Sequence, residues 1–340
     1  MHDLLRICRN IKDQKWTFTL AYVGVAGVVI CSMLVPRLLG NAIDLVLTSG
    51  DINGLILLAT IILILSALRG LSIFTQVHLS EKVSQKVAYK LRTQFLSHLE
   101  KLSFRFHDSQ KTGDLMSRGT YDIEVVRTFI QSVLIKLPQN LLLIFGSVIM
   151  IIVTNFQLGI LAIVVIPPAT ILTILVSTRL RQYWKIIQDD TGHLTTVLQE
   201  NLSGIRVVKA YGAENHELNK FDMVSKKVSD DTYLAAALMH SRQSIMQFAF
   251  AIVTVIVMWL GGLQIINESL TAGELTQLLL YLGMLVMPIR MLGMMVNSFA
   301  RALPSSTRLY TILDADSPVQ DAEDAIQLRE VRGHVQFKNV

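Results

Sequence analysis

The sequence predicts an all-α membrane protein of six long helices, with two helical hairpins that extend from the membrane into the cytoplasm. Hydrophobic residues make up 51% of the 340 residues and charged residues only 17%, a more apolar balance than that of typical soluble domains. The apolar residues form long uncharged runs, and a helix needs about 20 such residues to cross a bilayer. Long charged segments with apolar residues at helical spacing separate the runs.

The N-terminal segment and the apolar runs give the order of the elements. Residues 1–15 interleave basic and apolar side chains, and we expect an amphipathic helix there on the inner leaflet. The third and fourth spans share one uncharged stretch, 137–178, which the polar sequence TNFQ at 154–157 divides into a hairpin. The predicted transmembrane domain covers residues 16–312, with spans at about 17–45, 54–80, 134–154, 157–179, 243–266 and 275–300.

The distribution of Lys and Arg predicts which ends of the spans face the cytoplasm. Three stretches contain neither residue, namely 38–68, 137–178 and 243–289, and each holds one short connection between spans. Basic residues gather instead in 82–118, in 179–242 and near both ends of the chain. By the positive-inside rule the short connections face outward and both termini are cytoplasmic. The net charge of +5 reflects this bias better than it reflects a nucleic-acid surface.

The two basic segments between spans are too long to be ordinary loops. Apolar residues recur at helical spacing in the second, including Leu194, Val197 and Leu202, and neither segment contains a proline. Each therefore reads as a helical hairpin that continues the spans below the bilayer. We expect the first to turn at about 106–118 and the second around Gly212.

The C-terminal part of the chain changes character. Residues 313–330 are acidic and polar and contain Pro318, which is typical of a linker between domains. In residues 331–340, Val335 and Phe337 alternate with polar side chains, as in a β-strand. A lone strand cannot pair its backbone, so we expect these residues to open a further domain.

Motifs for catalysis and metal binding are absent from the sequence. It contains no phosphate-binding loop, nucleophile elbow, zinc-binding helix motif or dinucleotide-binding turn. The eight histidines are scattered, and Cys8 and Cys31 lack the spacing of metal ligands. We therefore expect no catalytic residue and no metal site in these 340 residues.

Several polar or soft side chains fall near membrane depth and are candidates for a substrate pathway. Ionisable groups are costly in a bilayer and usually face a cavity. Each candidate has a second interpretation: Arg37 could snorkel to the outer interface, amides could bond between helices, and methionines could pack in the core. The candidates are Arg37, Gln139, Met291, Met294 and Asn297.

A set of short motifs is shared with a known family. These are PRLLG at 36–40 with Asp44, LR at 91–92, LS at 102–103, TGDLMSR at 112–118 with Asp122, NLSGIRVVKA at 201–210 with Glu214 and Phe221, LTAGEL at 270–275, and Pro288. Together they resemble the transmembrane half of an ATP-binding-cassette (ABC) exporter of the six-helix half-transporter kind. The tail RGHVQFKNV is similar to the first strand of the nucleotide-binding domain.

The resemblance implies a dimer of half-transporters, homomeric or heteromeric, powered by two nucleotide-binding domains that bind ATP and Mg. These 340 residues lack the ATPase motifs, and the full-length protein is expected to be an ATP-hydrolysing translocase in a bacterial plasma membrane. Coupling helices at about 107–113 and 212–219 would contact the nucleotide-binding domains. The implied coupling residues are His107, Asp108, Thr112, Gly113, Asp114, Ser117 and Arg118 in the first hairpin, and Gly212, Ala213, Glu214, Asn215 and Glu217 in the second.

The resemblance leaves the substrate open, since drug, lipid and peptide exporters share this architecture. Lys90, Gly119, Tyr121 and Pro304 depart from common family patterns, which leaves the subfamily open too. A channel or secondary transporter without an ATPase domain is the alternative function. It would predict broken half-helices and acidic sites at mid-membrane, which the sequence does not show. A membrane scaffold would leave the long hairpins unexplained.

Overall fold

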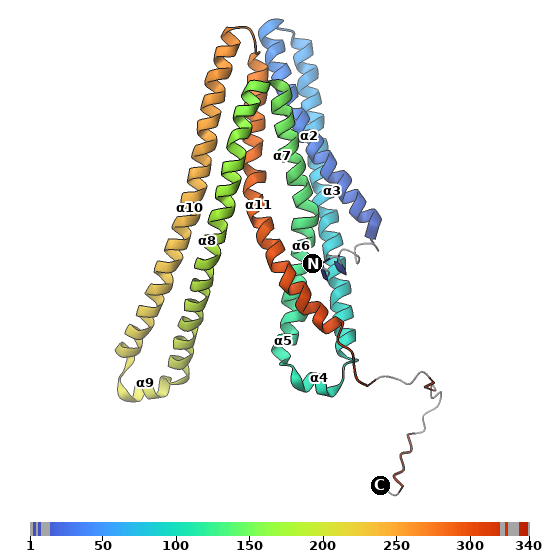
Figure 1. Ribbon diagram of the computed structural model, residues 1–340, viewed down its shortest axis with the longest axis vertical. Coiled ribbons are helices and arrows are strands. Elements are labelled where there is room, and N and C mark those ends of the chain that lie inside the picture. Colours follow the sequence, from blue (N-terminus) through green and yellow to red (C-terminus); the bar gives the residue numbers. More distant parts are fainter. Residues whose placement is uncertain (1–2, 5, 8–13, 320–323, 326–332, 339–340) are drawn as a thin grey trace.

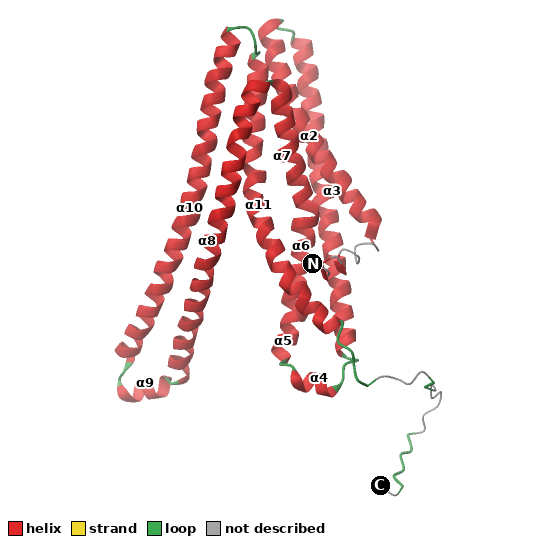
Figure 2. Ribbon diagram, viewed as in Figure 1, coloured by secondary structure: helices red, strands yellow, loops and turns green. Residues whose placement is uncertain are grey.

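The computed structural model describes the chain except for residues 1–2, 5, 8–13, 320–323, 326–332 and 339–340, and for the side chains of residue 242 and of several residues between 162 and 181. Its long helices run side by side at one end and diverge into two legs at the other (Figure 1). The described residues are helices joined by loops, without a strand (Figure 2), which confirms the predicted all-α class.

The first leg is built from the N-terminal half of the chain. Helix α2 (Lys15–Thr48) and helix α3 (Ile52–Leu99) form a hairpin, and the short helix α4 (Phe104–Ser109) lies at the foot of the leg. The chain then returns as one long helix, Thr112–Thr154. Two turns of this helix are wound as π-helix, so it is divided into α5 (Thr112–Ser117), η2 (Arg118–Asp122), α6 (Ile123–Phe129), η3 (Ile130–Lys136) and α7 (Leu137–Thr154).

The second leg is a long hairpin of two helices. Helix α8 (Phe156–Ser203) descends, α9 (Ile205–Tyr211) crosses the foot, and α10 (Glu214–Ile266) returns to the joined end (Figure 1). The last helix, α11 (Ala272–Leu313), begins at the joined end and descends into the first leg. It therefore packs against α7 and α2 above and against α6 and η2 below.

Side-chain caps start the helices that follow the three short connections. The carboxylate of Asp51 accepts from the backbone N–H of Asn53 (3.0 Å) at the start of α3, and Asn155 accepts from Leu158 N–H (3.0 Å) at the start of α8. Thr271 and Glu274 form a reciprocal capping box at the start of α11. Each connection thus satisfies helix N–H groups that would otherwise lack a partner.

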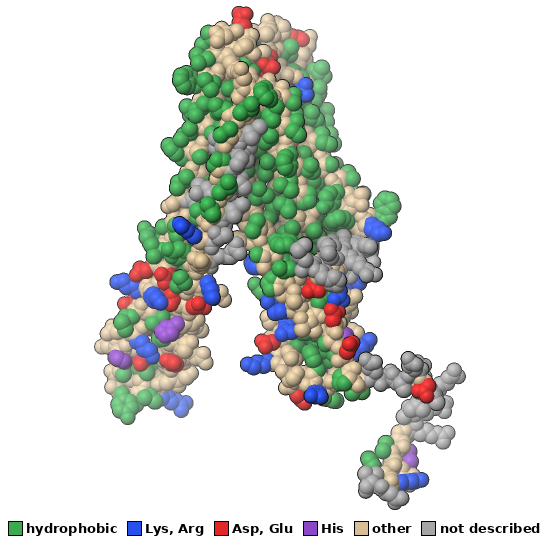
Figure 3. Space-filling model, in the orientation of Figure 1, with side chains coloured by type: hydrophobic (Ala, Val, Ile, Leu, Met, Phe, Trp, Pro, Cys, Tyr) green, Lys and Arg blue, Asp and Glu red, His purple; other side chains and the backbone are tan. Residues whose placement is uncertain are grey.

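Five helices of the described residues are long and apolar enough to cross a membrane: α2, α3, the helix Thr112–Thr154, α10 and α11. Figure 3 shows hydrophobic side chains over the joined end and charged ones gathered on the lower legs. The remaining predicted span, 157–179, which is the fourth along the chain, lies in α8, where several side chains are not described. The structure thus supports a multi-pass membrane protein.

Three hydrophobic clusters of the described residues hold the helices together, and the smallest, with Leu180, Ile187 and Ala235, joins α8 to α10 within the second leg. An upper core includes Tyr281, Leu285 and Phe250 and joins α7, α8, α10 and α11. A lower core includes Leu91, Ile123 and Leu309 and joins α3, the α5–η3 segment and α11. Among the described residues the lower core takes nothing from α8 or α10, so the legs are packed independently at their feet.

Three expectations differ from the structure or lie partly outside it. The predicted strand at 331–340 is absent from its described residues, 333–338, where Val335 and Phe337 are exposed; a strand needs a partner to pair with. Of the N-terminal helix, residues 3, 4, 6 and 7 are helical, and Leu4 and Ile7 are buried against protein rather than exposed to lipid. The linker is only partly described.

Candidate functional site

The two motifs at the outer ends of α2 and α11 contact one another. Asp44 Oδ1 accepts from the backbone N–H of Gly273 (2.8 Å), and Asp44 Oδ2 accepts from the Thr271 hydroxyl (2.7 Å). A carboxylate is favourable beside the free N–H groups at a helix N-terminus. The backbones approach so closely that a Cβ on Gly273 would lie 2.1 Å from the Gly40 carbonyl oxygen. We call these contacts the outer clasp.

The seam between α2 and α11 continues below the outer clasp. The Tyr281 hydroxyl donates to the Met33 carbonyl oxygen (2.5 Å), and Tyr281 itself is fully buried. Helix α2 contains Pro36 in this stretch, three residues after Met33. The two helices are therefore joined by polar contacts from Met33 to the outer surface.

A cavity of about 440 Å³ lies below this seam, between α2, α3, the η3–α7 segment and α11. One part of its lining is polar and carries two cations, Arg69 from α3 and Lys136 from η3. Another part is apolar and soft, with Met284, Met287 and Met291 from α11. The remaining lining residues are Val28, Ser32, Ile73, Gln76, Val77, Gln139, Asn140, Leu143, Gly283 and Pro288.

The polar part of the cavity is held by amide contacts. Gln76 Nε2 donates to Gln139 Oε1 (2.5 Å), which joins α3 to α7, and Gln76 is only 4% exposed. Asn140 Nδ2 contacts the Met295 sulfur of α11 at 3.6 Å. Buried amides of this kind fix helices against one another in lipid. The arrangement leaves a pocket with a cationic side and a methionine side.

The structure brings only some of the predicted pathway residues to this cavity. Gln139 and Met291 line it, whereas Arg37, Met294 and Asn297 do not. Arg69, Gln76 and Lys136 also line the cavity and were not among the five candidates. Arg69 carried a usable signal, because it is the single charge within an apolar stretch that continues on both sides.

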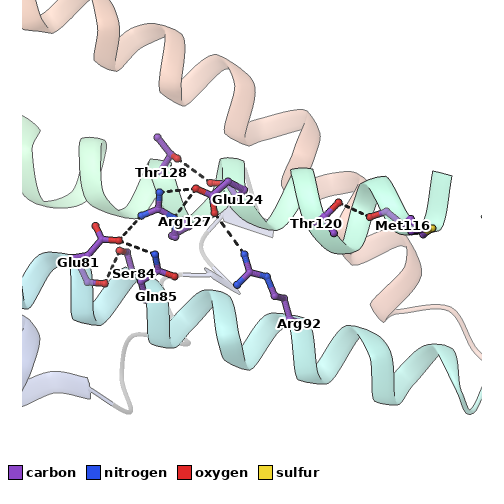
Figure 4. A network of polar contacts seen from close by, with 9 residues as sticks. All are labelled: Glu81, Ser84, Gln85, Arg92, Met116, Thr120, Glu124, Arg127 and Thr128. Carbon is purple, nitrogen blue, oxygen red and sulfur yellow. Dashed lines mark hydrogen bonds and ion pairs between the residues drawn. The ribbon is translucent and has the colours of Figure 1, made fainter. Parts of the chain in front are cut away.

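A network of charges lies below the cavity, between α3 and α6 (Figure 4). The Arg127 guanidinium donates to Glu81 on α3 (2.9 Å) and to Glu124 one turn away (2.8 and 2.6 Å). Glu81 also accepts from Gln131 of η3 (2.9 Å), and Arg92 lies 3.6 Å from Glu124. The Arg127 hydrogen bonds hold the pKa of Glu124 below its usual range. These contacts join η3, which carries Lys136, to the C-terminal half of α3.

The foot of the first leg presents the predicted residues of the first hairpin. His107 and Asp108 lie on α4, and Thr112, Gly113 and Asp114 open α5. The helical structure is interrupted at Gln110 and Lys111, between α4 and α5, so Gly113 lies inside a helix rather than in the turn. Except for the half-buried Arg118, the seven predicted residues are exposed, as is Phe104, whose side chain is 89% exposed.

The foot of the second leg differs from the sequence-based expectation. The second hairpin was expected to turn around Gly212, but α8 already ends at Ser203 and Gly204 separates it from α9. The short crossing helix is therefore residues 205–211, and the predicted range 212–219 is a turn followed by the start of α10. Gly204, which lacks a Cβ and lowers helix propensity, stands at the break.

The turn after α9 depends on Gly212, whose φ of 59° lies in the left-handed region. Lys209 donates to Glu214 across this turn (2.8 Å), and this contact holds the pKa of Glu214 below its usual range. Asn201 Nδ2 reaches Glu217 at 3.4 Å. Sequence reasoning missed the apolar side chains that α9 exposes at the foot, Ile205, Val207 and Tyr211, although apolar residues in a cytoplasmic turn were a visible signal.

Metal binding has no support among the described residues, where no three His, Cys, Asp or Glu side chains gather closely enough to hold an ion. The described features that could serve a function are a cavity at membrane depth and an exposed foot on each leg. That arrangement suits movement of a molecule through the membrane under the control of partners at the feet.

Comparison with known proteins agrees with this architecture. Residues 18–289 match the family described as ABC transporter transmembrane region. The chain is 27% identical over 309 residues to YknV of Bacillus subtilis strain 168, described as an uncharacterized ABC transporter ATP-binding protein, a match that covers 91% of this chain and 51% of YknV. It is 28% identical over 290 residues to the ATP-dependent lipid A-core flippase of Escherichia coli K12, covering 85% of this chain and 50% of the flippase. The flippase of Photorhabdus laumondii is 28% identical over 280 residues, covering 82% and 48%. The chain spans about half the length of these relatives.

Proposed function

Because the chain belongs to the family of ABC transporter transmembrane regions, we propose that it is the membrane-spanning part of an ATP-driven exporter or flippase for anionic amphiphiles. The observation that carries the substrate class is the cavity between α2, α3, α7 and α11. Arg69 and Lys136 on its polar side suit a phosphate or carboxylate head group, since cations bind such groups with charge-assisted hydrogen bonds. Methionines 284, 287 and 291 on its other side suit a variable apolar body.

The proposed topology has six spans: the five long apolar helices and, between α7 and α10, helix α8. Its N-terminal half enters directly after the outer connection at Asn155, and it runs beside α10 along the second leg. The charged feet lie in the cytoplasm, as the positive-inside rule requires. With α8 included, both termini lie on the cytoplasmic side, and the relatives in bacteria favour a bacterial plasma membrane.

Energy would enter at the two feet. Each foot ends in a short helix, α4 or α9, which exposes apolar side chains far from the membrane. Such a surface in a solvated region indicates a protein partner. We assign this surface to ATP-binding domains that hold ATP and Mg, one of which would follow the linker. A second half-transporter, of the same or a different kind, would complete the transporter. The relatives include an ABC transporter ATP-binding protein and an ATP-dependent lipid A-core flippase.

The separate packing of the two legs also supports alternating access. The outer ends are joined by the outer clasp, while the lower core lacks contributions from α8 and α10 among the described residues. Closing of the feet by ATP-binding domains would bring the legs together as rigid bodies. A channel or secondary transporter would leave the exposed feet without a role.

The test uses the full-length protein, with its ATP-binding domain, in proteoliposomes. We expect its ATPase activity to rise with anionic amphiphiles, such as lipids with a free phosphate head group, more than with zwitterionic or cationic ones. Arg69→Ala and Lys136→Ala should each raise the half-maximal concentration about tenfold, the effect of losing one charge-assisted contact of about 1.4 kcal/mol. Arg69→Lys should retain most of the affinity.

Arg37→Ala is the matched control, because Arg37 is also a membrane-depth arginine but does not line the cavity. It should leave the half-maximal concentration within about twofold of the wild type. Equal effects of Arg37→Ala and Arg69→Ala would contradict the assignment of the cavity. Absence of amphiphile-stimulated ATPase activity in the wild type would contradict the exporter function itself.

A further inference from the structure

The N-terminal segment of the chain is fastened to the cytoplasmic end of α11. Arg6 forms a two-pronged ion pair with Asp314, the residue that ends α11, with Nη1 to Oδ2 at 2.5 Å and Nη2 to Oδ1 at 2.7 Å. Its guanidinium also lies over the Tyr310 ring, 4.1 Å from the centroid. Asp3 accepts from the Thr307 hydroxyl at 3.3 Å. Two residues of the segment and three at the end of α11 are thus joined by three kinds of polar contact.

Apolar packing fastens the same segment from a second side. Leu4 and Ile7 lie three residues apart on one helix face and are 5% and 0% exposed. They belong to the lower core, together with Val87 of α3, Ile123 of α6 and Leu309 of α11. The segment therefore does not merely lie on α11, because its apolar face is shared by three helices of the first leg.

The ion pair is placed where helix electrostatics alone would not favour it. A carboxylate at the C-terminal end of a helix meets the negative end of the helix dipole. Arg6 offsets this repulsion, and its hydrogen bonds with Asp314 raise the pKa of the Arg6 guanidinium above its usual value. Docking of the N-terminal segment thus makes an aspartate more favourable at this position.

The residue after Asp314 has an anchor of its own. His98 in the last turn of α3 makes a hydrogen bond through Nε2 with the carbonyl oxygen of Ala315 (2.9 Å). The exit of α11 is therefore held by the N-terminal segment at Asp314 and by α3 at Ala315. The same helix carries the methionines of the cavity about six to eight turns above.

From these contacts we infer that residues 3, 4, 6 and 7 act as a strap that joins the exit of α11 to the first leg. Displacement of the linker that follows Asp314 then moves α11 and the α3–α6 part of the leg together, and with them the lining of the cavity. Without the strap, the last turns of α11 would yield locally, and less of the linker's motion would reach the cavity. This coupling role rests on the proposed function, whereas the fastening itself does not.

The fastening is tested by hydrogen exchange on the full-length protein in nanodiscs. Arg6→Asp should speed amide exchange in residues 307–315 about five- to tenfold, as expected for the loss of an ion pair and a cation–π contact. The exchanged-charge pair Arg6→Asp with Asp314→Arg should restore most of the protection. Leu4→Ser with Ile7→Ser tests the apolar half of the strap and should also speed exchange there.

Lys15→Asp is the matched control, since it makes the same change of charge at the start of α2. It should leave exchange in residues 307–315 unchanged. Unchanged exchange in both Arg6→Asp and the Leu4/Ile7 variant would overturn the strap. Failure of the exchanged-charge pair to restore protection would also overturn it, because the ion pair would then not be the fastening.

The coupling role is tested by the number of substrate molecules moved per ATP hydrolysed. Arg6→Asp should lower this ratio at least threefold while basal ATP hydrolysis continues, with recovery in the exchanged-charge pair. Faster exchange with an unchanged ratio would overturn the coupling role. Absence of ATP-driven transport in the wild type would refute the proposed function, and the exchange experiment would still decide whether the strap exists.

Discussion

Arg308, near the C-terminal end of α11, donates hydrogen bonds from Nε and Nη2 to the carboxylate of Asp122, which lies 186 residues earlier in η2. The Nε–Oδ2 distance is 2.9 Å. The two partners differ in burial, since the Asp122 side chain is 3% exposed and the Arg308 side chain 46%. This pair ties α11 to the helix that rises from the foot of the first leg.

The difference in burial predicts unequal effects of removing each partner. Arg308→Ala leaves a buried carboxylate without its cation, and we expect the free energy of unfolding to fall by about 2–3 kcal/mol. Asp122→Ala leaves a guanidinium that water can reach, and we expect a loss of about 1 kcal/mol. The apparent melting temperatures of the purified variants would show the order. An equal or larger loss for Asp122→Ala would contradict the prediction.

The outer clasp predicts that Gly273 tolerates no side chain. An alanine Cβ would meet the Gly40 carbonyl oxygen at 2.1 Å and the Asp44 carboxylate at 2.4 Å, so α2 and α11 would have to separate. We expect Gly273→Ala to cost about 2–3 kcal/mol of stability. The control is Gly262→Ala in α10, which meets nothing within 4 Å and should be neutral or stabilising by about 0.5–1 kcal/mol. Thermal unfolding of both variants checks the difference.

The foot of the second leg predicts a separate effect of backbone conformation. Gly212 has a φ of 59° and open space around it, so Gly212→Ala meets no clash but must adopt a strained left-handed conformation. We expect a local cost of about 1 kcal/mol, seen as faster amide exchange in α9. Gly113→Ala, inside α5 with open space, should leave its foot intact. Equal effects at the two glycines would contradict the helix assignments.

Two facing carboxyl groups predict a pH effect in the second leg. The Oδ2 atoms of Asp190 on α8 and Asp231 on α10 are shielded from solvent and have no hydrogen-bond donor among the described groups. The two carboxyl groups can form a hydrogen bond with each other only by sharing a proton. The hydrogen bond with Asp190 raises the pKa of Asp231, whereas Lys227 lowers the pKa of Asp190. Repulsion therefore destabilises the hairpin at neutral pH and is relieved as the pH falls through the raised pKa of Asp231.

Asp231→Asn should accordingly protect the α8–α10 hairpin from proteolysis at neutral pH. The advantage over the wild type should shrink as the pH is lowered through the raised pKa, because the wild type then takes up the proton. Asp222→Asn makes the same charge change on α10 and should give no such pH-dependent gain. A gain from Asp231→Asn that persists unchanged in acid would refute the shared proton.

Much of the architecture follows from one-dimensional patterns. The uncharged runs predicted the helices α2, α3, α7, α10 and α11, since a helix in lipid must satisfy its own backbone and expose apolar side chains. The polar connections predicted where helices turn, and their Asp51, Asn155 and Thr271 side chains are the caps that the turns require. The family resemblance singled out Asp44 and LTAGEL at 270–275, but it did not predict that the two contact each other.

The site was predicted only in part, because a cavity depends on how helices are rotated against one another. Gln139 and Met291, predicted from their type and depth, line the cavity, whereas of the two arginines within apolar helices Arg69 lines it and Arg37 does not. The π-helical winding of η3 shifts the angular position of Lys136 relative to an unbroken α-helix. Helical periodicity assumed a uniform turn and therefore could not place it.

By itself, the sequence determined the long apolar helices and the exposed feet, because hydropathy, charge and proline or glycine positions act through the local environment of each segment. Only the tertiary structure decided which residues share the cavity, that α9 rather than residues 212–219 crosses the second foot, and that Leu4 and Ile7 pack on protein. Those outcomes depend on contacts between segments far apart in the chain, such as Arg6 with Asp314 and Asp44 with Gly273. Close packing selects among such contacts, and no single segment contains that information.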